Sequence, residues 1–218
     1  MTTTLRLFPL HMVLFPGMPL SLQIFEERYR TLVSECLTSG EPFGVVLSGD
    51  RAELGAGTGP FPMGTTALID GVTPLASGRL ALTGHGVRRF HITRLLYDRP
   101  YLSAEVDYPV DEATEVPPAL LEQVASNYAQ LQRLRHTIGG SWVREVRVPQ
   151  SPAELADAVG AAGNGLLEPR RLQPLLEMLD MRRRLERADD LLASILESTH
   201  RRAQQAVAQR WGGPEHEN

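Results

Sequence analysis

The chain has 218 residues, of which 42% are hydrophobic, and its formal net charge at pH 7 is −4. A chain of this length can bury a sizeable core, as one large domain or as two small ones. The mild negative charge gives no global indication of nucleic-acid binding, which a basic face or a high pI would provide. Cys36 is the only cysteine, which excludes an internal disulfide bond and a multi-cysteine zinc site.

Lysine is absent from the sequence, and all 22 basic residues are arginine. Such a chain lacks the lysine that a P-loop ATPase uses, the lysine that forms a Schiff base and the lysine of a Ser-Lys dyad. These three kinds of catalysis are therefore excluded for this chain.

The segment 5–29, LRLFPLHMVLFPGMPLSLQIFEERY, is strongly apolar but is interrupted by three prolines. Arg6 is the only arginine among the first 27 residues, so the basic start of a secretory signal is missing. No run approaches the roughly 20 apolar residues of a membrane-spanning helix. Proline favours strand starts, edges and turns, so we expect this segment inside the folded body of a cytoplasmic protein that makes no membrane contact.

The first two-thirds or so of the chain is rich in apolar, β-branched and aromatic runs that are separated by glycine, proline and aspartate. This pattern predicts strands near residues 4–8, 20–24, 43–48, 65–76, 79–84, 87–97 and 101–108. Ser77-Gly78 indicates a hairpin turn. Apolar residues at helical spacing, followed by Gly40, predict a helix over residues 26–37. Cys36 falls on its buried face, where a free cysteine acts as a small hydrophobic residue.

Residues 50–64 form a predicted glycine-rich surface loop that contains two apolar side chains, Phe61 and Met63. Loops are mostly polar and exposed, so both side chains are unusual there. They either fold back against the β-rich region or form an exposed apolar spot of the kind that binds partners.

The pattern becomes helical after Pro117-Pro118. Apolar residues between positions 120 and 134 predict a helix that ends at Gly139-Gly140. Ser151-Pro152-Ala153-Glu154 is a capping box with proline at the first helical position, and it predicts a helix to about residue 162. The longest helix is expected over residues 172–202.

We therefore expect an α+β fold in which a β-rich domain precedes a bundle of helices. The expected domain boundaries are 1–116 for the β-rich domain, 117–205 for the helical bundle and 206–218 for a flexible tail.

No histidine pair shows a metal-ligand spacing such as HExxH. His85 and His91 could approach each other around the flexible Gly84-His85-Gly86, but no carboxylate lies beside them in the sequence, so we expect no metal site. Arg88 and Arg89 should point to opposite faces of a strand, and we expect one of them to pair with a carboxylate inside the domain.

Several separate motifs then occur in one order. The opening carries Leu7-Phe8-Pro9-Leu10, Leu14-Phe15-Pro16-Gly17 and Ile24-Phe25-Glu26, and it resembles the start of the N-terminal, substrate-binding domain of Lon protease. Later segments that resemble the same family are GRLALTGHGVRRFHI, RPYLSAEV and LQPLLEMLDMRRRLERADDLL. The resemblance covers roughly residues 4–200.

This resemblance implies a PUA-like β-barrel followed by an α-helical bundle. It also implies a polypeptide-binding role without catalysis. We expect a stand-alone domain, because the ATPase and protease modules of Lon depend on lysines that this chain lacks. No catalytic residue, cofactor or metal is expected.

The expected ligands are unfolded or exposed polypeptide segments, and we consider a protease or a chaperone as the partner protein. The candidate contacts are apolar residues expected outside regular structure, where methionine adapts well to varied ligands. They are Met12, Met18, Phe61 and Met63. The residues that match the family motif, Pro9, Pro16, Gly17 and Phe25, are expected to hold the fold instead.

Two alternatives remain open from the sequence. The first is a PUA-like nucleic-acid-binding module, which would need a continuous patch of Arg88, Arg89, Arg94 and Arg99 and whose binding would weaken with salt. The acidic balance argues against it. The second is an enzyme that uses Cys36 or a histidine.

Overall fold

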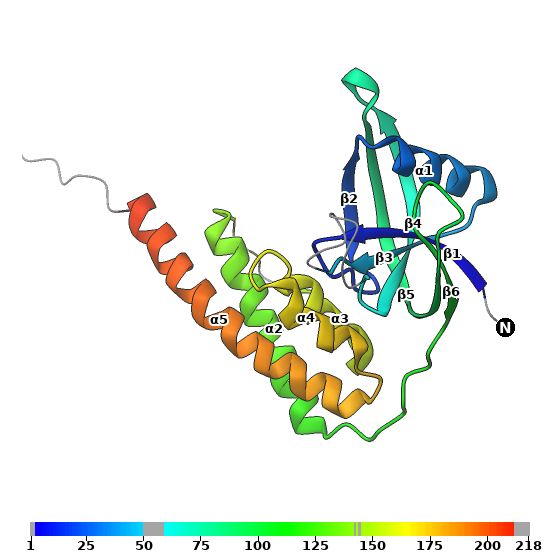
Figure 1. Ribbon diagram of the computed structural model, residues 1–218. Helices are drawn as coiled ribbons and strands as arrows, with labels where there is room; N and C mark the ends of the chain where they lie inside the picture. Colours follow the sequence, from blue (N-terminus) through cyan, green and yellow to red (C-terminus); the bar gives the residue numbers. More distant parts are fainter. Residues whose placement is uncertain (1–2, 50–58, 142, 144, 212–218) are drawn as a thin grey trace, which may run out of the picture. The chain divides into compact units, whose positions relative to one another are not determined.

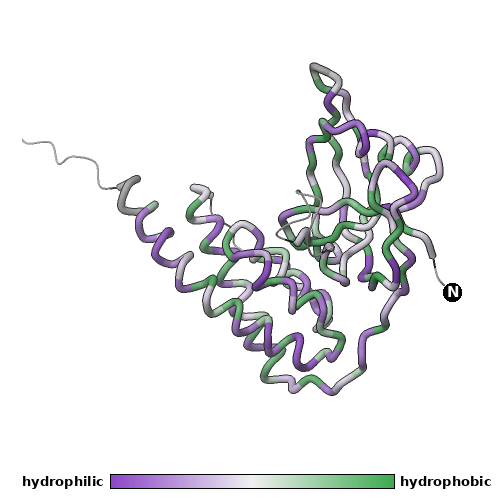
Figure 2. The backbone as a smooth tube through the Cα atoms, viewed as in Figure 1, coloured by the Kyte–Doolittle hydropathy of each residue, from purple (hydrophilic) through white to green (hydrophobic). Residues whose placement is uncertain are grey.

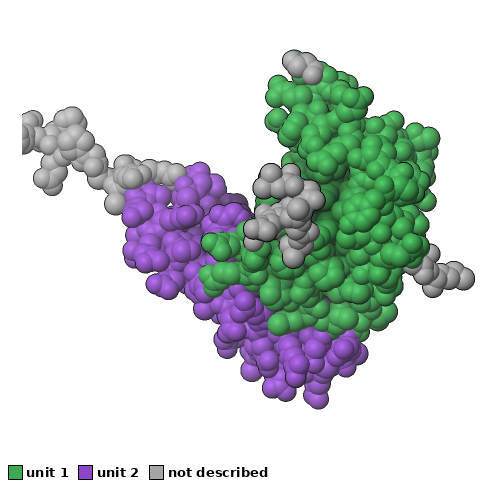
Figure 3. Space-filling view, viewed as in Figure 1, with its two compact units in different colours: residues 1–111, 168–179 green, residues 112–167, 180–218 purple. Residues whose placement is uncertain are grey.

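The computed structural model describes residues 3–49, 59–141, 143 and 145–211 (Figure 1). The chain forms two compact units, which are coloured separately in Figure 3. The first unit consists of residues 1–111 and 168–179, and the second of residues 112–167 and 180–218. The chain therefore passes from the first unit to the second twice.

The strands of the first unit form one mixed sheet. They are β1 (Thr3–Leu10), β2 (Pro19–Ile24), β3 (Phe43–Leu47), β4 (Met63–Pro74), β5 (Leu80–Leu96) and β6 (Ser103–Asp107). A short 3₁₀ turn, η2 (Ala76–Gly78), joins β4 to β5 where the hairpin turn was predicted, and Gly78 has a φ of 71° there. The apolar and β-branched runs thus predicted the positions of the strands well.

The order of the strands is β2-β5-β4-β3-β1-β6, and β5 also pairs with β6. The pairings β5–β4–β3–β1–β6 therefore return to β5 and close a ring of strands. β1 and β3 are parallel, and the other neighbours are antiparallel. β2 stands outside this ring, alongside the first half of β5 (Figure 1).

The expected break between two strands at residues 85–86 is wrong, because β5 runs through this segment as a single strand. Gly86 is needed because Phe15 approaches it closely, and not because the chain turns there. A Cβ on Gly86 would lie 2.3 Å from the carbonyl oxygen of Phe15. The N–H of Gly17 donates to Gly86, and the N–H of Gly86 donates to Met18, both at 2.9 Å.

Helix α1 (Glu27–Ser39) confirms the predicted helix and ends at Gly40, whose φ is 70°. Its buried face packs into a core with strand residues, and the rings of Phe8 and Tyr29 stack at 4.0 Å. Cys36 is part of this core, as predicted. A second buried cluster consists of Leu5, Leu7, Val46, Phe90, Ala104 and Val106.

Phe25 departs from its expected role. It follows β2 directly and is 69% exposed, so it does not fill the core. Gly17 fits the expectation, because its φ of 74° favours glycine in the turn before β2.

The second unit contains α2 (Pro118–Ile138), α3 (Pro152–Gly163) and α5 (Met181–Trp211), with α2 and α3 both packed against α5. The capping box is confirmed: the hydroxyl of Ser151 accepts the N–H of Glu154 at 3.2 Å. Hydrophilic and hydrophobic segments alternate along α5 in Figure 2. The helix continues through residues 206–211, which were expected in the tail, and residues 212–218 lie outside the described ones.

The predicted helix over 172–202 is two helices. α4 (Pro169–Glu177) belongs to the first unit, and α5 begins at Met181 in the second. A local cap explains the break, because a carboxylate oxygen of Asp180 accepts the N–H of Arg183 at 2.8 Å. An aspartate in this position starts a new helix rather than continuing the old one. The expected domain division therefore differs from the structure at residues 168–179, and also at residues 112–116, which belong to the second unit.

None of the helices in the described ranges is both long and apolar enough to cross a membrane.

Candidate functional site

The four predicted contact residues have different surroundings. Met12 and Met18 lie in the connection between β1 and β2 and are half-buried against the core beneath α1. Phe61 is half-buried, and its N–H donates to the carbonyl of Leu47 at 3.0 Å. Met63 was expected outside regular structure, which is wrong: it starts β4 and is 7% exposed. Its carbonyl accepts a hydrogen bond from the side chain of Gln173 at 3.0 Å.

Met12 and Met18 are part of a larger apolar border. Seven half-buried apolar side chains pack against the core cluster that α1 covers, and we call them the apolar rim. They are Leu10, Met12, Met18, Leu22, Ile69, Val72 and Leu80. Methionines from a connection thus lie around the same core as aliphatic residues from β1, β2, β4 and β5.

The strand register explains how distant segments contribute to the rim. Leu22 of β2 and Val72 of β4 both lie opposite Leu82 of β5. Directly opposed side chains share one face of a sheet, so these residues form a row across three strands. Leu82 is buried, whereas Leu22 and Val72 at the two ends of the row stay partly exposed.

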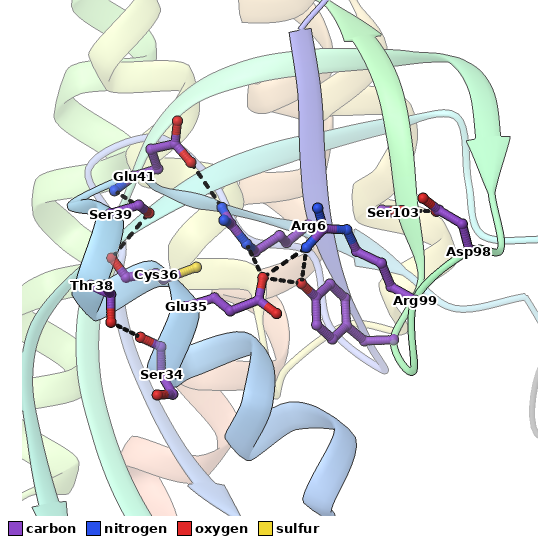
Figure 4. Close-up of polar contacts among 11 residues, drawn as sticks. Arg6, Ser34, Glu35, Cys36, Thr38, Ser39, Glu41, Asp98, Arg99 and Ser103 are labelled. Atoms are coloured by element: carbon purple, nitrogen blue, oxygen red, sulfur yellow. Dashed lines mark hydrogen bonds and ion pairs between the residues drawn. The ribbon is translucent and has the colours of Figure 1, made fainter.

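A polar cluster ties α1 to the strands (Figure 4). Glu35 of α1 accepts hydrogen bonds from Arg6 of β1 at 3.0 Å, from Arg99 at 2.8 Å and from the hydroxyl of Tyr101. Arg6 also pairs with Glu41 at 2.9 Å. The partners in these four interactions are separated by 29 to 66 positions in the sequence, so the cluster joins segments that only the fold brings together.

The cluster lowers the pKa of its two carboxyl groups and raises the pKa of its tyrosine. The Tyr101 hydroxyl and the Arg6 guanidinium lower the pKa of the Glu35 carboxyl. The hydrogen bond from Arg6 likewise lowers the pKa of Glu41. Burial raises the pKa of Tyr101, and its hydrogen bond to Glu35 raises it further. Such a cluster stabilises the position of α1 while Glu35 is ionised.

Replacing Glu35 with glutamine is therefore expected to remove part of the acid sensitivity of the fold. A carboxyl with a lowered folded-state pKa contributes stability above its unfolded pKa of about 4.3, and this contribution is lost as the pH falls through the folded pKa. At about pH 5, the Tm of Glu35→Gln should be lower than that of the parent chain. As the pH falls from about 5 to about 3, the Tm of the variant should decrease by less than the Tm of the parent chain. Thermal unfolding followed by circular dichroism measures both.

The matched control is Glu115→Gln, a charge-neutralising change at an exposed position in the connection after β6. Its pH profile should follow that of the parent chain. Equal pH profiles for Glu35→Gln and the parent would show that the ion pairs on Glu35 do not contribute to stability.

Two histidines have carboxylate neighbours that were not anticipated. His85 lies 2.9 Å from Asp70 across β4 and β5, and His91 lies 3.5 Å from Asp107 across β5 and β6. Residues on adjacent strands can be close in space while far apart in sequence, so spacing alone could not find these pairs. Within the described ranges, no group of three or more histidine, cysteine, aspartate or glutamate side chains is placed to hold a metal ion.

Cys36 is placed poorly for nucleophilic chemistry. It is buried in the core beneath α1, and burial raises the pKa of its thiol to about 11. The thiolate is the reactive form, so a thiol with a raised pKa is inert at neutral pH.

The four arginines of the nucleic-acid alternative each have a contact inside the first unit. Arg88 lies 3.5 Å above the ring of Tyr108, and Arg94 donates to Glu105 at 3.1 Å. Arg89 is 8% exposed and donates to the carbonyl of Leu176 in α4 at 2.9 Å. Arg99 pairs with Glu35. All four arginine side chains therefore contact other residues of the first unit.

No pattern in the sequence indicates the polar cluster, whereas one pattern does indicate part of the rim. Leu20, Leu22 and Ile24 alternate with polar residues along β2, which is typical of a strand with one apolar face. Only the register shows that Leu22 lies at the border of that face, whereas Leu20 and Ile24 are buried.

Comparison with known proteins shows the family. Residues 4–194 match the family described as the ATP-dependent protease La (LON) substrate-binding domain. The chain belongs to the Lon substrate-binding domain family. A Lon N-terminal domain protein from Xanthomonas campestris, known from a crystal structure, is similar to it with 30% sequence identity and a TM-score of 0.62. That match covers 88% of this chain and 98% of the other.

Other relatives of this Lon-family domain are longer or more distant. The N-terminal domain of a Mycobacterium avium complex Lon protease shares the fold, with a TM-score of 0.64 at 18% identity. Lon protease 2 of Myxococcus xanthus is 27% identical over 185 residues, and the Lon protease of Roseiflexus castenholzii is 30% identical over 188 residues. The chain spans 22% and 23% of the length of these two curated relatives.

Proposed function

We propose that this Lon-family domain captures unfolded or exposed polypeptide segments on its apolar rim and catalyses no reaction. In this proposal it is a cytoplasmic protein, built as a PUA-like β-barrel and a helical bundle, that acts with a protease or a chaperone. The observation that carries the proposal is the apolar rim, in which seven partly exposed apolar side chains border one continuous core.

The physical basis is burial of apolar surface. Removing apolar surface from water contributes about 25 cal/mol per Å², before the cost of ordering the ligand is subtracted. Met12 and Met18 supply flexible, polarizable side chains that adapt to ligands of different shape. The rim therefore suits a class of apolar segments better than one defined sequence.

Three observations support a role without catalysis. The chain contains no lysine, so the lysine chemistry of an ATPase or a Ser-Lys peptidase is excluded. The family match concerns the substrate-binding domain of Lon. The buried Cys36, with its raised pKa, argues against a cysteine nucleophile.

Titration of a labelled, permanently unfolded polypeptide with this protein tests the proposal. Fluorescence anisotropy is measured without ATP at two salt concentrations. Saturable binding that persists at high salt is expected, because burial of apolar surface is weakly screened. Binding that disappears with salt would indicate charged contacts instead of apolar burial. A salt-dependent shift with labelled RNA would support the nucleic-acid alternative. Absence of binding at tens of micromolar would contradict polypeptide capture.

Replacing Val72 with threonine is expected to weaken this binding about fivefold. Threonine keeps the shape and the strand preference of valine but places a hydroxyl on the rim. Burying that hydroxyl against an apolar ligand costs about 1 kcal/mol. The matched control is Val87→Thr in β5, the same change at an exposed position outside the rim, and its affinity should stay unchanged. Equal affinities for both variants would exclude the rim as the contact surface.

A further inference from the structure

β2 is the one strand in the described part of the chain that has a single partner. Each of the others pairs with two or more strands, whereas β2 pairs only with β5. Beyond the β5 ladder, residues 19–24 make no hydrogen bond within the described part of the chain. The far edge of β2 therefore offers unused main-chain donors and acceptors.

The register identifies which groups face this edge. The N–H of Gly86 donates to the carbonyl of Met18 at 2.9 Å, and pairing then continues without a bulge from Pro19 to Ile24. In an antiparallel pair, alternate residues direct their main-chain groups toward the partner and the others direct them away. The N–H and C=O groups of Ser21 and Gln23 thus point away from β5.

Natural proteins usually protect such an edge with charge, proline or bulges. The part of β4 beyond its pairing with β3, residues 68–74, carries all three: one register irregularity between Ile69 and Gly71, Asp70 and Pro74. β2 has no charged residue, and its proline lies at its first position. β2 is also continuous with apolar surface, because Leu22 belongs to the rim and the exposed Phe25 follows the strand.

We propose that an extended polypeptide segment binds by adding a strand to the free edge of β2, with main-chain hydrogen bonds to Ser21 and Gln23 and apolar side chains against Leu22 and the adjoining rim. This inference rests on the proposed function and adds the mode of binding. Main-chain hydrogen bonds do not depend on ligand sequence, and every second side chain of the ligand faces the rim. The edge therefore selects extended segments with alternating apolar residues.

Ser21→Pro and Gln23→Pro test the main-chain contacts. Proline removes the outward N–H, and it leaves the β5 ladder intact because these N–H groups do not face β5. The controls Ser21→Ala and Gln23→Ala change the same side chains but keep the N–H. The probe is a labelled peptide of about ten residues with alternating valine and serine, long enough for one strand.

Each proline variant is expected to bind this peptide about tenfold more weakly than its alanine control, which corresponds to about 1.4 kcal/mol. Circular dichroism and thermal unfolding check that the variants are folded. A second measurement needs no variant: the same peptide with its central amides N-methylated should also bind about tenfold more weakly. Equal affinity for the methylated and unmethylated peptides would overturn the proposal even if the proline variants unfold.

The remaining outcomes separate the two proposals. If the peptide and a permanently unfolded polypeptide both fail to bind the parent chain, polypeptide capture and strand addition both fail. If they bind and the proline and alanine variants do not differ, strand addition alone is overturned. If the parent chain is a dimer and the proline variants are monomers with unchanged peptide binding, the edge pairs with a second copy, and the proposal is again overturned.

Discussion

Replacing Phe90 with alanine is expected to lower the free energy of unfolding of the first unit by about 3–5 kcal/mol, the usual cost of truncating a buried phenylalanine. Phe90 of β5 is fully buried in the cluster with Leu5, Leu7 and Val46. Its ring lies over two glycines: a Cβ on Gly44 or on Gly64 would come within 2.7 Å of the ring. The ring thus fills space that β3 and β4 leave open for it.

Urea denaturation followed by circular dichroism measures this loss. The control is Val87→Ala, a truncation in the same strand at an exposed position, which should change stability by about 0.5 kcal/mol or less. A loss of under about 1 kcal/mol for Phe90→Ala would mean that neighbouring side chains collapse into the space, and that the ring does not hold the strands together.

Replacing Gly64 with alanine is expected to destabilise the first unit by about 3 kcal/mol, at the upper end of the cost of overpacking. A Cβ at this position would lie 2.3 Å from the carbonyl oxygen of Val45 in the neighbouring strand and 2.7 Å from Phe90. Rotation of the Phe90 side chain can relieve the contact with its ring, but no side-chain rotation can move the main-chain carbonyl of Val45. β3 and β4 must therefore separate locally, which weakens one pairing of the closed ring.

Gly71→Ala is the matched control, because it introduces the same methyl group into the same strand. There the nearest atom to the new Cβ is the hydroxyl of Thr83 at 3.3 Å, at the end of a side chain that can rotate. We expect a change within about 1 kcal/mol, of either sign. Comparable losses for the two variants in urea denaturation would show that strand flexibility, rather than the contact with Val45, determines the cost.

Where the sequence succeeded, the signal was local. The capping box at Ser151 is confirmed because the hydroxyl and the N–H that it joins are three residues apart. Helix α1 was predicted from apolar spacing and from Gly40, both within a few turns of the backbone. The order of the family motifs predicted the family, which the match over residues 4–194 shows.

The prediction from the sequence failed in two places, once because of a contact from a distant segment and once at a local helix cap. Gly86 resembles a turn residue in the sequence, but Phe15 approaches it so closely that only glycine fits within a continuous strand. The helical pattern of residues 172–202 was read as one helix, although Asp180 caps a new one and α4 belongs to the first unit.

The same distinction between local and long-range signals holds for the candidate site. By itself, the sequence determined which strands are apolar, that lysine chemistry is absent and that Met12 and Met18 are apolar residues of a connection, since these follow from composition and short-range periodicity. The tertiary structure alone decided that Leu22 and Val72 lie in one row, that Met63 is buried and that β2 keeps a free edge. Strand order and register arise from pairings between distant residues, and local periodicity does not encode them.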